Sequence, residues 1–302
     1  MKIFVTGATG FIGSAILKEL IGAGYQVLGL TRSDAGAKSL AALGAQAHRG
    51  ELTDLESLRS GAAASDGVIH TAFVHDFSKF KENCEIDGRA IEALGSALIG
   101  SERPLLITSG MTTVAQGRPA TEDDAASPAF PRVSEAAAEA LLKRGVRASV
   151  VRLSQVHNRI KQGLVTYLIA HAREKGVSAY VGDGLNRWAA VHVLDAARLY
   201  RLALEKQEAG ARYHAVAEEG VLVRDIAEAI GRGLNVPVVS KSPEEAAAHF
   251  GSLGMFAGHD LTGSSAQTQQ RLCWRPKETS LLVDLEHMSY FPTQSRSLEK
   301  TA

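Results

Sequence analysis

The chain has 302 residues, 45% of which are hydrophobic, so it can form one large domain or two smaller ones around a sizeable core. The 33 basic and 33 acidic residues cancel, and no basic run is interleaved with aromatic residues. This balance disfavours nucleic acid and anionic membranes as partners, because both are bound through an excess of positive charge. We therefore expect a small-molecule substrate and a protein that is a monomer or a homodimer.

The cysteines and the two ends of the sequence bear on where the protein works. Cys84 and Cys273 are far apart and form neither a disulfide framework nor a metal-ligand cluster, so we expect no metal site and a reducing compartment. The sequence shows no signal peptide and no run of membrane-spanning length. These features favour a cytoplasmic protein. Residues 293–302 are polar and lack periodicity, which predicts a disordered tail.

The first 155 residues alternate short apolar runs with amphipathic segments of helical length. The expected strands are residues 2–6, 25–31, 67–73, 104–110 and 147–154, and the expected helices are 11–24, 35–44, 81–100 and 134–145. Such alternation predicts βαβ units and therefore an α/β fold, a Rossmann-type doubly wound parallel sheet with helices on both faces.

Beyond residue 155 the alternation loosens into helical segments separated by glycine-containing loops. This pattern predicts a smaller, mostly helical substrate lobe packed on the edge of the sheet. We assign residues 1–155 and about 187–215 to the dinucleotide-binding domain. Residues of about 156–186 and 216–292 are assigned to the substrate lobe.

A spaced-glycine motif follows the first strand and opens the first helix. Gly7 would permit a tight turn, Gly10 would let the backbone approach a pyrophosphate, and Gly13 would allow close packing of helix on strand. The helix N-terminus would then face the negative charge of the phosphates. A glycine-rich turn without a ligand is the alternative. The predicted cofactor-binding residues here are Thr6, Gly7, Thr9, Gly10, Phe11, Ile12 and Gly13.

The end of the second strand indicates which dinucleotide is bound. An acidic residue there would bind the ribose hydroxyls of NAD(H), but the sequence reads Thr31, Arg32 and Ser33, and no carboxylate occurs before Asp34. Arg32 can pair with a 2′-phosphate, to which Thr31 and Ser33 can donate hydrogen bonds. The segment therefore favours NADP(H) over NAD(H), unless Arg32 only begins a solvated loop.

Three later segments accompany the opening motif: GELTDLESL (50–58), VVRLSQVHN (150–158) and VGDGLNRWAAVHVLDAARL (181–199). Together they resemble the short-chain dehydrogenase/reductase superfamily, and within it the extended or atypical branch related to the NAD-dependent epimerase/dehydratases of nucleotide sugars. The resemblance extends over roughly residues 1–290.

The resemblance also implies roles for individual residues. His192 and Asp195 are expected to anchor their helix. The implied cofactor contacts are Glu51 and Leu52 at the adenine, His70, Thr71 and Ala72 at the end of the fourth strand, and Ser154, Gln155 and Val156 near the nicotinamide. Arg187 and Trp188 are implied to face the substrate.

The catalytic residues typical of that superfamily are missing. With Glu139 as the anchor of the register, Pro131 stands at the tyrosine position and Glu135 at the lysine position. The expected serine or threonine falls on or beside Gly110, and the expected asparagine is Glu85. No tyrosine occurs between Met111 and Val165, so a shifted register would not restore one. A positioned acid or base contributes about a hundred- to ten-thousandfold in rate, so reduction through the usual tyrosine is not expected.

Three kinds of replacement are candidates to take over part of this role. Arg132 could polarise a carbonyl or hold an anionic group, Thr112 or Thr113 could donate a hydrogen bond, and His157 could deliver a proton. Each has a structural alternative. Arg132 could pair with Glu135 along its helix, either threonine could cap a turn, and the histidine could lie at an interface.

The favoured function is an NADP(H)-dependent oxidoreductase that acts on a small carbonyl, enone or imine by hydride transfer without the usual Tyr/Lys relay. One alternative is a catalytically inactive, dinucleotide-sensing regulatory protein. A second alternative is a nucleotide-sugar epimerase or dehydratase, which would need the base that the chain lacks.

Overall fold

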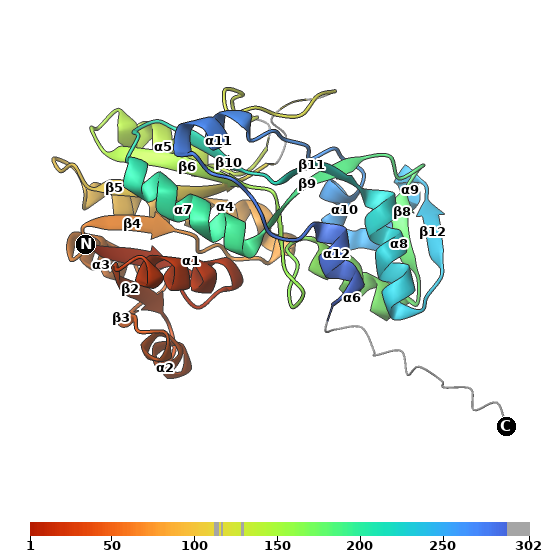
Figure 1. The fold of residues 1–302 in the computed structure, drawn as a ribbon, viewed down its shortest axis with the longest axis horizontal. Helices are drawn as coiled ribbons and strands as arrows, with labels where there is room; N and C mark the ends of the chain where they lie inside the picture. Colours follow the sequence, from red (N-terminus) through yellow and green to blue (C-terminus); the bar gives the residue numbers. More distant parts are fainter. Residues whose placement is uncertain (112–114, 116, 128–129, 289–302) are drawn as a thin grey trace.

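The computed structural model describes residues 1–111, 115, 117–127 and 130–288, and it shows two lobes (Figure 1). The predicted doubly wound parallel sheet is confirmed. Within the described residues the central sheet has seven strands in the order β10-β6-β5-β4-β1-β2-β3, and all neighbours are parallel. Strand order reverses between β1 and β4, and a crevice for a ligand forms at such a switch point, beyond the carboxyl ends of the strands.

The strands of the central sheet are short, and the inner strands are mostly apolar, as expected for a sheet covered on both faces. They are β1 (Lys2–Thr6), β2 (Gln26–Thr31), β3 (Gln46–Arg49), β4 (Gly67–His70), β5 (Pro104–Gly110), β6 (Arg147–Leu153) and β10 (Arg212–Ala215).

Helices cover both faces of this sheet and bury two separate apolar cores. One face carries α1 (Phe11–Gly22) and α7 (Val193–Lys206), which pack on each other and on the sheet. The opposite face carries α3 (Leu55–Ala63), α4 (Phe80–Ser96) and α5 (Ser134–Leu142). The helix α2 (Asp34–Ala42) packs on β3 at the edge, and α11 (Ala266–Leu272) lies beside β10 and α7.

The second lobe surrounds its own core and contains two small sheets. Its strands are β7 (Gln155–His157), β8 (Ser178–Val181), β9 (Arg187–His192), β11 (Glu218–Leu222) and β12 (Val238–Lys241). Its helices are α6 (Val165–Lys175), α8 (Val223–Leu234), α9 (Pro243–Phe250), α10 (Gly254–Ala257) and α12 (Leu281–Glu286). Two short 3-10 helices, η1 (Phe77–Lys79) and η2 (Gly251–Leu253), lie near the contact between the lobes.

Two predicted lobe boundaries differ from the structure. Strand β9, placed with the dinucleotide-binding domain, pairs with β7 and β11 in a separate sheet. Residues 266–274, placed in the substrate lobe, return to the central sheet, where Leu272 and Trp274 join the core under α7. The chain then crosses back to the second lobe at α12 (Figure 1). Local pattern could not show these crossings because they depend on long-range pairing.

The predicted tail at residues 293–302 lies outside the described residues. Among the residues that the structure describes, no helix combines the length and the apolar character that a bilayer crossing requires.

Candidate functional site

The loop between β1 and α1 has the geometry that a pyrophosphate requires. Gly7 lies in the left-handed region with φ 67°, and a Cβ on Gly13 would lie 2.1 Å from the carbonyl oxygen of Gly7. Gly10 is the N-cap of α1 and provides no side-chain cap, so the first turn's N–H groups face the crevice without an internal acceptor. These residues fit a dinucleotide, whose phosphates would accept hydrogen bonds from that turn.

The end of β4 is tied to the end of β1 beside this loop. Thr71 Oγ1 donates to the carbonyl oxygen of Thr6 at 2.7 Å, and the backbone N–H of Ala72 donates to Thr6 Oγ1 at 3.3 Å. A Cβ on Gly7 would lie 2.8 Å from the nitrogen of Ala72. The structure therefore brings the glycine loop together with Thr71 and Ala72. His70 adjoins them in sequence, but its imidazole is buried and points into the protein.

At the predicted binding site for the adenosine half of the cofactor, exposed side chains follow β2 and β3. Arg32 is exposed after β2, whereas Thr31 is buried and Ser33 Oγ accepts the N-cap hydrogen bond of α2 from Gly36. Arg32 is therefore available to a phosphate, and the exposed Ser33 keeps its hydroxyl proton for donation, whereas Thr31 is not accessible. After β3, Glu51 is exposed and Leu52 is partly buried against the core beneath α3 and α4.

A buried chain of hydrogen bonds leads from the glycine loop toward α5. His70 Nδ1 lies 2.8 Å from Thr6 Oγ1, and His70 Nε2 lies 3.1 Å from Asp87 Oδ1. Ser134 Oγ donates to Asp87 Oδ2 at 2.6 Å and accepts from Arg132 Nε at 2.8 Å. Asp87 and Ser134 were not predicted as site residues. One signal could have revealed Asp87: it is a carboxylate on the buried face of α4, the face that also carries Asn83, Cys84, Ala90 and Ile91.

Arg132 lies at the carboxyl end of β5. Its Nη2 donates to the carbonyl oxygen of Thr108 at 3.1 Å, and its guanidinium carbon lies 4.1 Å from the ring centroid of Phe73, which follows β4. The Arg132 side chain is 16% exposed, and the alternative pairing with Glu135 does not form. The guanidinium is therefore held beside the switch-point crevice by contacts with β5, α5 and the segment after β4.

Glu135, which the sequence register places at the predicted lysine position, has a structural role. Glu135 accepts hydrogen bonds from Arg152 of β6 at 2.8 and 2.7 Å and lies 3.3 Å from Arg212 of β10. It is buried and attaches α5 to the sheet, so it does not face the crevice.

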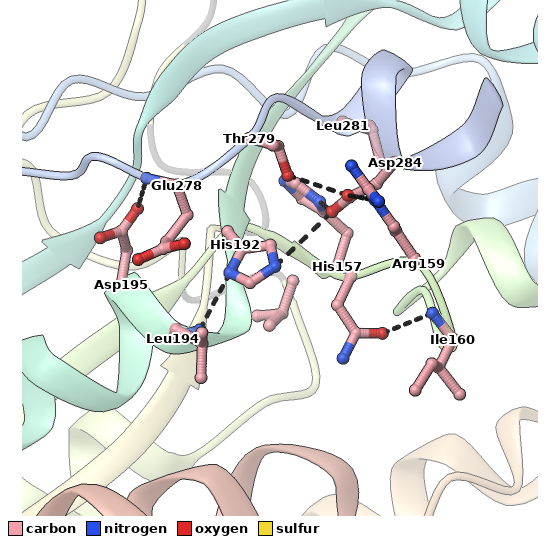
Figure 2. A network of polar contacts seen from close by, with 12 residues as sticks. His157, Arg159, Ile160, His192, Leu194, Asp195, Glu278, Thr279, Leu281 and Asp284 are labelled. Atoms are coloured by element: carbon pink, nitrogen blue, oxygen red, sulfur yellow. Dashed lines mark hydrogen bonds and ion pairs between the residues drawn. The ribbon is translucent and has the colours of Figure 1, made fainter. Parts of the chain in front are cut away.

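His157 is not placed to deliver a proton. Figure 2 shows it pointing from β7 toward Asp284 of α12, and its side chain is 0% exposed. His157 Nδ1 lies 2.8 Å from Asp284 Oδ2, and burial lowers the imidazole pKa to about 4. The predicted catalytic role is therefore wrong, because a buried, neutral imidazole cannot reach a substrate. His157 instead lies at the contact between β7 and α12, which agrees with the structural alternative of an interface residue.

Other predicted site residues have mixed outcomes. Trp188 is 1% exposed in the core of the second lobe, so the predicted substrate contact is wrong, whereas Arg187 is exposed. Gln155 and Val156 are buried, and Ser154 Oγ donates to the carbonyl oxygen of Ala215, so only their backbone can approach a nicotinamide. Thr112 and Thr113 lie outside the described residues.

His192 and Asp195 anchor α7, as expected. His192 caps the helix by accepting from the backbone N–H of Leu194, and Asp195 accepts from the backbone N–H groups of Lys277 and Glu278 (Figure 2).

A doubly wound sheet, a glycine loop at its switch point and an open helix N-terminus together define a nicotinamide dinucleotide-dependent oxidoreductase. Comparison with known proteins narrows this class: residues 3–217 match the NAD dependent epimerase/dehydratase family. The chain belongs to this family.

Two fungal relatives span almost the whole chain. An uncharacterized protein of Schizosaccharomyces pombe, C2A9.02, is 49% identical over 96% of this chain and 100% of its own length. An uncharacterized protein of Saccharomyces cerevisiae, YLL056C, is 45% identical over 94% and 98%. Among solved structures, a dTDP-glucose 4,6-dehydratase from Streptomyces venezuelae with NAD bound has a TM-score of 0.76 at 19% identity, with 95% of each chain covered. At that identity the likeness shows a shared fold.

Proposed function

We propose that the protein is an NADP(H)-dependent reductase of small carbonyl or enone compounds in which Arg132 replaces the usual Tyr/Lys relay. The observation that supports this proposal is the position of Arg132, which is fixed by contacts with Thr108 of β5, Ser134 of α5 and Phe73, a residue that follows β4. When bound, the nicotinamide supplies the hydride that the substrate carbon accepts.

The role of Arg132 follows from its unused donors. A guanidinium has five N–H groups, of which one on Nε and one on Nη2 are donated to Ser134 and Thr108. Arg132 Nη1 has no acceptor among the residues that the structure describes. These free N–H groups can hold the substrate oxygen while it gains negative charge, and water then supplies the proton. Reduction of a carbonyl or enone places negative charge on an oxygen that these N–H groups can hold, whereas reduction of an iminium ion yields a neutral amine, so carbonyls and enones fit better than the predicted imines.

The preference for NADP(H) rests on Arg32. It is exposed at the carboxyl end of β2, beside the N-terminus of α2, where both a guanidinium and helix N–H groups can meet a 2′-phosphate.

A kinetic comparison tests this function. Purified protein is mixed with NADPH or NADH and panels of ketones, aldehydes, enones and cyclic imines, and loss of the reduced nicotinamide is followed by absorbance. Arg132→Gln should lower kcat about a hundredfold, as loss of an oxyanion donor does, and leave NADPH affinity unchanged. Arg89→Gln, at an exposed arginine on α4, is the matched control. Tight dinucleotide binding without turnover on any panel would contradict the proposal and favour the regulatory alternative.

A further inference from the structure

The positive charge of Arg132 already has a buried partner. Arg132 Nη2 lies 3.9 Å from Asp87 Oδ2, and the Asp87 side chain is 1% exposed. Burial alone would raise the pKa of Asp87, but the hydrogen bond from His70, the charge of Arg132 and the hydrogen bond from Ser134 outweigh it and hold the pKa below its usual value. Asp87 is therefore ionised at neutral pH.

The hydrogen bonds around Asp87 have one consistent direction. The backbone N–H of Ala72 donates to Thr6 Oγ1, so the Thr6 hydroxyl proton is free to point at His70 Nδ1. His70 Nε2–H then donates to Asp87 Oδ1, while the Ser134 hydroxyl donates to Asp87 Oδ2. Both carboxylate oxygens are satisfied. The carboxylate cannot rotate away from the guanidinium without breaking this chain, so the two charges form a fixed pair.

The surface beside this pair is aromatic. Phe73 lies under the guanidinium, and its ring centroid is 6.1 Å from that of Phe80. The rings continue across the contact between the lobes, with Phe130 5.5 Å from Phe80 and 6.2 Å from Phe256 of α10. Phe73 and Phe130 are partly exposed. Such rings attract a flat, apolar molecule and offer no hydrogen bonds to sugar hydroxyls.

We propose that Asp87 determines specificity: by neutralising Arg132, it makes the site select uncharged aromatic or apolar carbonyl compounds over compounds that carry a carboxylate or phosphate. This inference rests on the proposed function. On binding, a permanent anion would lose its hydration and lie beside an ion pair without net charge. Little electrostatic attraction would then offset the free-energy cost of the lost hydration. A neutral carbonyl loses little hydration, and its oxygen gains charge only when it already contacts the guanidinium.

Two matched probes test the inference: 4-carboxybenzaldehyde, an anion at neutral pH, and its uncharged methyl ester, methyl 4-formylbenzoate. Their dissociation constants for the NADP⁺-loaded full chain are measured by calorimetry. The wild type should bind the ester about tenfold or more tightly than the acid.

Two variants change the charge of the site in opposite directions, and a third leaves it unchanged. Asp87→Asn, which adds one positive charge, should shift the affinity ratio toward the acid by about tenfold or more. Arg132→Gln, which removes one, should shift the ratio toward the ester. Ser134→Ala removes hydrogen bonds without changing charge and should leave the ratio unchanged. A merely structural role of Asp87 would weaken both probes equally.

The inference is overturned if the wild type binds the acid as tightly as the ester, if it binds neither, or if Asp87→Asn leaves the ratio unchanged. Should Asp87→Asn fail to fold, as circular dichroism would show, the shift toward the ester expected for Arg132→Gln and the unchanged ratio expected for Ser134→Ala decide. Turnover of small polar carbonyls with no preference for the ester would leave the proposed function standing and refute only the specificity. Binding with the expected ratio but no turnover of any carbonyl would refute the proposed function alone.

Discussion

Glu135 of α5 and Arg152 of β6 form a two-point ion pair, with hydrogen bonds of 2.8 and 2.7 Å, and Arg152 is 0% exposed. By the register anchored at Glu139, Glu135 stands at the predicted lysine position. In this chain the residue there attaches a helix to the sheet.

Restoring the usual residues should therefore damage the protein. Glu135→Lys would place a third cation against Arg152 and Arg212, and breaking a buried pair in this way costs about 3–5 kcal/mol. Denaturant unfolding measures the loss. Glu139→Lys, at a side chain 55% exposed on the same helix, should cost far less. The double variant Pro131→Tyr with Glu135→Lys should gain no activity, and a gain would contradict the structural role of Glu135.

The absence of the usual tyrosine and lysine is a prediction from the sequence, since it needs only a register and a count of tyrosines. The buried groups around Arg132 could not be predicted in this way. Asp87 and Ser134 meet across two helices, and a pattern along one helix does not show which buried groups face each other. Arg132 was predicted, but its partners were not.

The glycine loop provides a second prediction. Gly13→Ala would place a Cβ 2.1 Å from the carbonyl oxygen of Gly7, so the loop must shift and dinucleotide binding should be lost. Fluorescence titration with NADPH measures this. Gly22→Ala lies on the same helix, where an added Cβ meets nothing within 4 Å, and should bind normally. Equal binding by both variants would show that the loop is not the pyrophosphate site.

Cofactor preference should reside in Arg32. Arg32→Glu should weaken NADPH about ten- to hundredfold, because a charge-assisted contact contributes roughly 1.5–3 kcal/mol, and should spare NADH. The readout is the ratio of the two dissociation constants. Lys38→Glu makes the same charge change at an exposed position further along α2 and should alter the ratio little. An unchanged ratio of the two dissociation constants in Arg32→Glu would refute the proposed contact between Arg32 and the 2′-phosphate of NADP(H).

Stability should fall in mild acid because of His157. Its pKa in the folded protein is about 4, below the ordinary value of 6.5, so the unfolded chain binds the proton more readily between these values. The contribution of neutral His157 to the free energy of unfolding is fully present above about pH 6.5. At pH 5 the free energy of unfolding should be lower by roughly 2 kcal/mol.

Unfolding of wild type and His157→Gln at pH 7.5 and 5 isolates this contribution, with His259→Gln at an exposed histidine as control. The groups facing His157 are Asp284, Glu218 and His192. Glu218 acts in the opposite sense, since burial raises its pKa and its folded form gains protons as the pH falls. A pH dependence unchanged in His157→Gln would refute the assignment to His157.

The alternation of strands and helices predicted the central sheet because each βαβ unit is local. The second lobe was predicted only as helical. Strands of three to six residues such as β7 and β9 have no periodicity to detect, and they acquire their pairing from segments far away in the sequence. For the same reason Trp188 looked like a cleft residue, although it lies in a core that several distant segments complete.

The crossing of residues 266–284 between the lobes has a consequence for how the chain is made. During synthesis, Trp274 reaches the core under α7, and Asp284 reaches His157, only after more than 270 residues have been made. Neither lobe can be completed early, although domains generally fold in the order in which they are translated. A nascent chain stalled before residue 266 should therefore remain exposed to proteases, because residues 266–284 contribute to both lobes.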